Sequence, residues 1–130
     1  MMPRPRTLLT AILLLGLVQI ACTTVPMMDP PRENLPTNAA RTEVDVANAI
    51  KRAAAELGWK TADAGPGLIT ATLNLRTHVA IVSIRYDADG YEIRYQDSEN
   101  LDHSGNRIHR AYNHWVRNLD ARTRTQLGYE

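Results

Sequence analysis

Three histidines stand among acidic side chains in the C-terminal part of the chain, and both residue types are common zinc ligands. The set comprises His103, His109, His114, Asp97, Glu99 and Asp102. Two histidine ligands on one helix need a spacing of three or four residues, whereas His109 and His114 are five apart and point in different directions. We therefore predict no metal site. A site built from His103, His109 and an acidic loop residue stays open as an alternative.

Signatures of catalysis are weak elsewhere in the sequence. Ser83, Ser98 and Ser104 lack the Gly-x-Ser-x-Gly setting of a hydrolase nucleophile. Gly65 and Gly67 flank Pro66, which has no N–H to offer a phosphate, and no Lys-Ser/Thr pair follows. We predict a protein that is not an enzyme. The alternative is a small hydrolase or metal-binding protein that uses the region of His103 and His109.

Tyrosine, asparagine, histidine, tryptophan and arginine gather between residues 95 and 119. Tyrosine, tryptophan and arginine dominate the energetic centres of protein interfaces, so this stretch is the candidate binding surface. The predicted surface residues are Asn100, His109, Arg110, Asn113, Trp115 and Arg117. A plainer interpretation assigns Trp115 to the core and leaves the polar residues solvated.

Helical spacing of apolar residues predicts two helices. The first follows Thr42, which can cap it with Asp45 three residues on, and it ends at Gly58. The second is expected over residues 107–127, with Tyr112 and Leu119 on its apolar stripe.

Between the two helices, alternating apolar and polar residues over 69–76 and 91–96 and a nearly continuous β-branched run over 78–86 predict three or four strands, with a short one at 59–64. A turn is expected at 87–90, in which Gly90 supplies a positive φ. Short connections require antiparallel pairing. The expected fold is α+β, a two-layer sandwich with both helices on one face of the sheet and the order α-β-β-β-β-α.

The segment before this domain is rich in proline. Pro26, Pro30, Pro31 and Pro36 stand between Thr23 and Ala40 without periodicity, which favours extended, solvated backbone. We predict a flexible tether over residues 22–40 and a folded domain over 41–130.

The first residues have the plan of an export signal. Arg4 and Arg6 precede an apolar run over residues 8–18, and no acidic residue occurs before Asp29. The run is shorter than the roughly 20 apolar residues that a membrane-spanning helix needs. It is typical of a cleaved signal peptide, expected over residues 1–21.

The end of this run resembles the lipobox of bacterial lipoprotein precursors. Ala21 matches the small residue before the cleavage site, Ile20 fits the position before it, and Gln19 departs from the usual leucine. The resemblance implies a diacylglycerol on the thiol of Cys22, cleavage before Cys22 and acylation of the new amine. A signal peptide cut elsewhere and an uncleaved membrane anchor are the alternatives.

The chain is also similar to small uncharacterised envelope lipoproteins of proteobacteria, on the stretch from Tyr95 to Leu119. Thr23 follows the cysteine where an aspartate would imply retention in the inner membrane, so the lipoprotein resemblance implies the outer membrane, with the domain in the periplasm. We expect a membrane-anchored binding or assembly module whose partner is an envelope protein or cell-wall fragment. Its one expected prosthetic group is the covalent lipid on Cys22.

Charge argues against nucleic acid as a partner. The 130 residues include 15 basic and 14 acidic side chains, a net charge of +1. Loss of Arg4 and Arg6 with the signal peptide would make the formal side-chain charge −1. With so little net charge, the protein is not expected to have the strongly basic surface that binding to the phosphate backbone of a nucleic acid requires.

Overall fold

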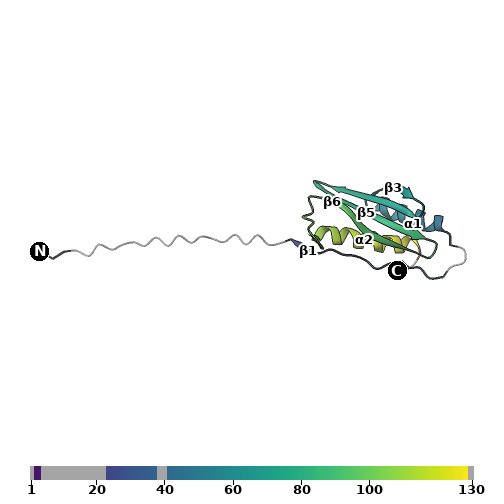
Figure 1. The fold of residues 1–130 in the computed structure, drawn as a ribbon, viewed down its shortest axis with the longest axis horizontal. Coiled ribbons are helices and arrows are strands. Elements are labelled where there is room, and N and C mark those ends of the chain that lie inside the picture. Colours follow the sequence, from purple (N-terminus) through teal and green to yellow (C-terminus); the bar gives the residue numbers. More distant parts are fainter. Residues whose placement is uncertain (1, 4–22, 38–40, 129–130) are drawn as a thin grey trace.

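Two helices and seven strands make up the part of the chain that the computed structural model describes, residues 2–3, 23–37 and 41–128 (Figure 1). The predicted signal peptide, apart from Met2 and Pro3, and the predicted lipid site Cys22 lie outside the described residues. The elements in chain order are β1 (Thr24–Pro26), β2 (Glu33–Asn34), α1 (Glu43–Glu56), β3 (Lys60–Gly65), β4 (Leu68–Leu75), β5 (His78–Asp87), β6 (Gly90–Glu99), β7 (Arg107–His109) and α2 (Arg110–Gln126).

The expected α+β class is confirmed, but the number of strands differs. A five-stranded antiparallel sheet has the order β2–β6–β5–β4–β3, and β1 pairs with β7 in a separate two-stranded sheet. The predicted run of four strands between the helices corresponds to β3 to β6. β1, β2 and β7 were missed, because strands of two or three residues carry no readable alternation.

Helix α1 begins as the sequence predicts. The side-chain oxygen of Thr42 accepts a hydrogen bond from the backbone N–H of Asp45 at 3.2 Å, and the carboxylate of Asp45 accepts one from the backbone N–H of Thr42 at 2.7 Å. These reciprocal bonds satisfy two N–H groups that the first turn leaves free. The helix ends before Gly58, whose φ of 84° few other residues adopt.

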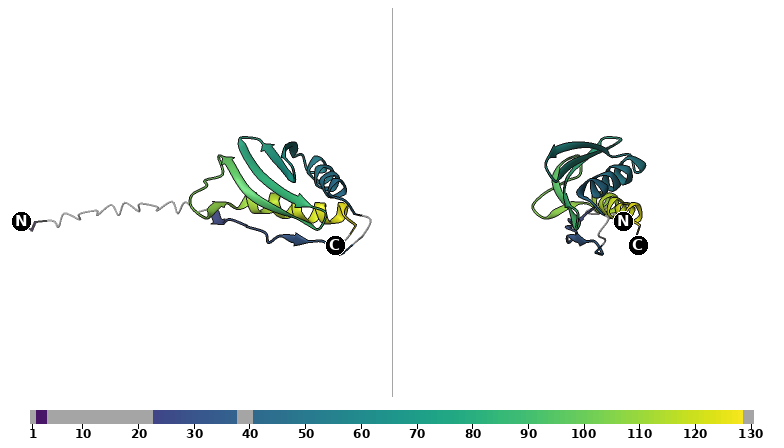
Figure 2. Two further views of the ribbon diagram at one scale, coloured as in Figure 1. Left: turned by 45° about the vertical axis from the view of Figure 1, so that its right-hand side comes forward. Right: turned by 90° about the vertical axis from the view of Figure 1, so that its right-hand side faces the viewer.

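The core lies between one face of the sheet and the two helices, which pack on the same side of it (Figure 2). Ile69 and Ala71 of β4 and Val82 and Ile84 of β5 alternate inward, as expected for half-buried strands. Leu75 departs from this pattern: it lies at the end of β4 and remains 47% exposed.

Helix α2 begins three residues later than predicted. Residues 107–109 form β7, because each of them pairs with β1: Thr24 with His109, Val25 with Ile108 and Pro26 with Arg107. The side chain of His109 then caps the helix. A strand that pairs with a distant segment has overridden the local helical spacing.

The expectation of a flexible tether is wrong for residues 23–37. This segment runs along α2 and the β6 edge of the sheet, from β1 to β2 (Figures 1 and 2). Met27 and Met28 pack against the core, and Leu35 is buried within it. The prolines exclude a helix but permit extended edge strands, and the apolar side chains between them supply the burial that holds the segment in place.

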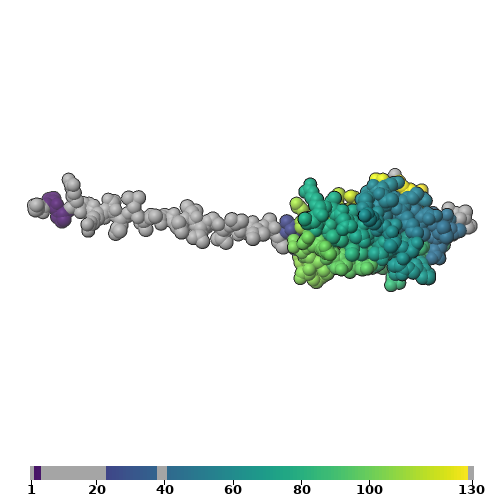
Figure 3. Space-filling model, turned by 90° about the horizontal axis from the view of Figure 1, so that it is seen from above, coloured from purple at the N-terminus to yellow at the C-terminus, as the bar shows by residue number. Residues whose placement is uncertain are grey.

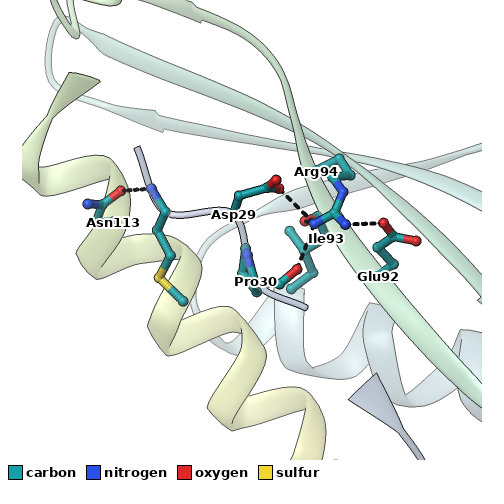
Figure 4. A network of polar contacts seen from close by, with 7 residues as sticks. Asp29, Pro30, Glu92, Ile93, Arg94 and Asn113 are labelled. Atoms are coloured by element: carbon teal, nitrogen blue, oxygen red, sulfur yellow. Dashed lines mark hydrogen bonds and ion pairs between the residues drawn. The ribbon is translucent and has the colours of Figure 1, made fainter. Parts of the chain in front are cut away.

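The N-terminal segment, residues 23–37, is also fixed by polar contacts along its length (Figure 4). The amide of Asn113 accepts a hydrogen bond from the backbone N–H of Met28 at 2.7 Å and donates one to the carbonyl oxygen of Pro26 at 2.9 Å. The guanidinium of Arg94 binds the carboxylate of Asp29 at 2.7 Å and the carbonyl oxygen of Pro30 at 2.6 Å. The folded unit therefore includes residues 23–37 of the predicted tether.

Gly90 serves a different purpose from the one predicted. The two-residue turn between β5 and β6 consists of Ala88 and Asp89, and Gly90 does not have a positive φ. A Cβ at position 90 would overlap the carbonyl oxygen of Glu33. Glycine is required here because β2 approaches the backbone of β6 closely.

Candidate functional site

Aromatic and imidazole rings gather at one end of the domain, which we call the β1 end. It comprises β1, the turn between β4 and β5 (residues 76–77), the loop of residues 100–106 and the first turns of α2. Two antiparallel hairpins bring the start of β5 and the end of β6 to this place. Seen from above, the domain is elongated, with residues around 100–109 at this end and α1 toward the other (Figure 3).

Two groups of rings form what we call the ring cluster. In the first, His78 of β5 stacks on His109 with ring centroids 5.9 Å apart and lies 6.3 Å from Trp115. In the second, Tyr95 of β6 lies 4.4 Å from His103 and meets Tyr112 edge-on at 5.7 Å. The ring cluster therefore joins the sheet to α2 and to the loop between them.

Asn100 fixes the position of His78. The backbone carbonyl oxygen of Asn100 lies 2.7 Å from Nδ1 of His78 and can only accept, so Nδ1 carries the proton. The side-chain amide of Asn100 donates to the carbonyl oxygen of Thr77 at 2.6 Å, which ties the loop to the β4–β5 turn. In its neutral form, His78 thus offers Nε2 as a hydrogen-bond acceptor.

His109 has the opposite arrangement. Its Nδ1 accepts a hydrogen bond from the backbone N–H of Ala111 at 3.1 Å, as the cap of α2. A neutral His109 therefore carries its proton on Nε2. The stacked pair presents one acceptor nitrogen and one donor nitrogen, a combination suited to a polar planar group and not to two bonds with one metal ion.

The predicted metal-binding alternative finds no geometric support in the described part of the chain. No three histidine, cysteine or acidic side chains converge among residues 2–3, 23–37 and 41–128. His103 packs on Tyr95, His109 caps α2, and Nε2 of His114 contacts the amide of Asn118 at 3.3 Å. The three histidines thus have separate surroundings.

Ser98, near the end of β6, contacts another hydroxyl group. Oγ of Ser98 lies 2.9 Å from the hydroxyl of Tyr95.

Burial raises the pKa of the Tyr112 phenol above its usual range, and the nearby Tyr95 and Asp29 add to the effect. Tyr112 is neutral at physiological pH and contributes an apolar ring.

The six predicted surface residues do not form a single patch. Asn100 and His109 meet around His78, and half-buried Trp115 joins them from α2. Asn113 is occupied by the N-terminal segment. Arg110 and Arg117 are exposed on α2. One turn of helix separates Arg117 from Asn113, whereas Trp115 points to the other side of the helix.

His78 is the member of the ring cluster that sequence reasoning missed. It stands in a predicted strand that explains it as an ordinary strand residue. Only the pairing of β5 with β6 brings His78 and the loop after β6 together. No short-range pattern could have revealed that contact.

Two shallow grooves lie away from the ring cluster. One of about 300 Å³ is lined by residues such as Leu57 and Arg122, and one of about 320 Å³ by residues such as Val44 and Tyr86.

None of the helices in the described ranges is both long and apolar enough to span a bilayer.

Comparison with known proteins supplies no family. Scans against protein-family models, curated proteins and solved structures each found no match.

Proposed function

We propose that the protein is a lipid-anchored component of a bacterial cell envelope and that its domain binds another envelope component without catalysing a reaction. The observation that carries the proposal is the leader in the sequence, which has two arginines, an apolar run and Ala21-Cys22. A lipid on Cys22 is the modification that such a leader implies, and acyl chains hold a protein on a membrane through about 0.8 kcal/mol per buried methylene.

The start of the folded unit supports this interpretation. In the described chain, ordered pairing begins at Thr24, and the core residues follow from Leu35 onward. Cleavage before Cys22 would leave every one of these contacts in place. Every strand and helix of the described chain lies after Cys22.

The ring cluster supports the binding role. His103 is exposed beside Tyr95, and the stacked pair of His78 and His109 is half-buried near Trp115. Aromatic side chains of this kind dominate interface energetics. A protein or cell-wall ligand with planar amide groups would match the acceptor on His78 and the donor on His109.

Metabolic labelling tests the anchor. Cells that express the full chain and grow with labelled palmitate should yield a labelled protein in the membrane fraction, and the variant Cys22→Ser should be unlabelled. An unlabelled wild-type protein that leaves the cells with the soluble periplasm would refute the anchor.

Photo-crosslinking in intact cells tests the binding role. A photoreactive amino acid at His103, within the ring cluster, should give a discrete adduct. The same amino acid at the exposed Arg85 of β5 serves as the control. Equal adducts at both positions, or none at His103, would argue against binding through the ring cluster.

A further inference from the structure

Only one peptide bond, between Cys22 and Thr23, separates the proposed lipid site from the folded domain. The carbonyl oxygen of Thr23 accepts a hydrogen bond from the backbone N–H of Arg110 at 3.2 Å, and Thr24 pairs with His109. Consecutive Cα atoms are 3.8 Å apart. Cys22 therefore immediately precedes backbone that is hydrogen-bonded to the first turn of α2.

We propose that the domain lies directly on the phospholipid bilayer, with Leu75, Arg76 and Arg110 of the β1 end in contact with the lipid head groups, so that the ring cluster meets its partner at the membrane surface. This inference rests on the proposed lipidation of Cys22. With no linker, the acyl chains hold the β1 end at the membrane and keep the remainder of the elongated domain pointing away from it.

The side chains at the β1 end suit an interface between water and lipid. Leu75 is a large apolar side chain that is 47% exposed. Arg76 follows it in the turn, and Arg110 is exposed on α2. Within the described ranges, neither guanidinium forms a hydrogen bond or an ion pair with another residue, so both are available to phosphate groups.

Charge alone does not hold this end on a membrane. Arg76, Arg107 and Arg110 are accompanied by acidic side chains, namely Asp97, Glu99 and Asp102. A basic side chain near an anionic bilayer contributes about 1 kcal/mol, and carboxylates oppose it. The acyl chains supply the affinity, whereas Leu75 and the free guanidinium groups favour one orientation.

The opposite end of the sheet provides a built-in reference position. Strand β5 contains 10 residues, and at about 3.3 Å per residue it spans about 33 Å. Asp89, in the turn after β5, is exposed and should lie about that far from the lipid head groups. Arg76 and Asp89 stand in two-residue turns at opposite ends of β5.

Fluorescence quenching in reconstituted vesicles tests the orientation. The full lipidated protein is purified as Arg76→Cys or Asp89→Cys, and because the Cys22 thiol is blocked by lipid, one fluorophore can be attached to each variant. Each is inserted into vesicles of phosphatidylethanolamine and phosphatidylglycerol that contain a lipid spin-labelled at the head group. We expect strong quenching at position 76 and no quenching at position 89.

A matched variant separates orientation from anchoring. Twelve glycine and serine residues inserted between Cys22 and Thr23 add a flexible reach of about 20 Å. Both proteins should still float with the vesicles, and the insertion should reduce the quenching at position 76. Flotation with equal quenching at both positions would overturn the orientation alone. A protein that fails to float would overturn the lipid anchor and the orientation with it.

Discussion

Asn113 connects α2 to the N-terminal segment in the way that a neighbouring strand would. Its amide accepts from the N–H of Met28 and donates to the carbonyl oxygen of Pro26, so one side chain occupies the position of a peptide group in a ladder. The variant Asn113→Ala removes both hydrogen bonds and leaves the half-buried N–H of Met28 without its partner. We expect this change to destabilise residues 24–28 and the whole fold.

The expected magnitude follows from these two bonds. Each contributes about 0.5–1.5 kcal/mol, so the loss is about 1–3 kcal/mol. Alanine is a better helix former than asparagine by roughly 0.5 kcal/mol, which partly offsets the loss. Asn118→Ala is the matched control: it lies on the same helix and has the same gain in propensity, but its amide makes only a 3.3 Å contact with His114.

Urea unfolding of both variants, followed by circular dichroism, measures the difference directly. Asn113→Ala should be less stable than Asn118→Ala by about 1–3 kcal/mol. Hydrogen exchange at the Met28 amide should also accelerate in Asn113→Ala alone. Equal unfolding midpoints, together with unchanged exchange at Met28, would refute the docking of the N-terminal segment on α2.

Three further variants probe other features of the fold. Arg76 has a φ of 58°, so Arg76→Gly should raise the free energy of unfolding by about 0.5–1 kcal/mol, measured in urea, and a loss would show that this φ is not strained. Gly90→Ala should lower the free energy of unfolding by about 1–3 kcal/mol because its Cβ would overlap the carbonyl oxygen of Glu33, and an unchanged midpoint would contradict that close approach. The backbone N–H of Asp89, followed by Arg32, holds the pKa of the Asp87 carboxyl below its usual range. This contribution is present above the unfolded-state pKa and is lost as the pH falls through the lower folded-state value. The urea midpoint of the wild type should therefore drop below about pH 4 more steeply than that of Asp87→Asn, and parallel pH profiles would count against the contribution.

Local signals predicted the elements that local contacts stabilise. Thr42 and Asp45 determine the start of α1 within three residues of each other, and Gly58 ends it. The alternation in β4 predicted that strand and most of its inward residues, and the nearly continuous β-branched run predicted β5. In these cases, capping, period and turn chemistry all favour the same structure.

Contacts between distant residues account for most of what the sequence did not reveal. β1 is three residues long and ends in Pro26, and it becomes a strand only because residues 107–109 lie beside it. His78 joins the ring cluster only because the loop after β6 folds back toward β5. Propensity cannot report such pairings, since the partner stands more than 20 residues away in each case.

The contact between the two ends of the chain determines when folding can be completed. Thr24 pairs with His109, and the carbonyl oxygen of Pro26 accepts a hydrogen bond from the amide of Asn113, which comes 87 positions later in the chain. A chain delivered with its N-terminus first, by a ribosome or through a membrane pore, can form the β4–β5 and β5–β6 hairpins early. It cannot close β1 onto β7 until residues 107–109 have emerged. Until then, Met27 and Met28 remain uncovered, which gives chaperones a defined interval in which to recognise the unfinished protein.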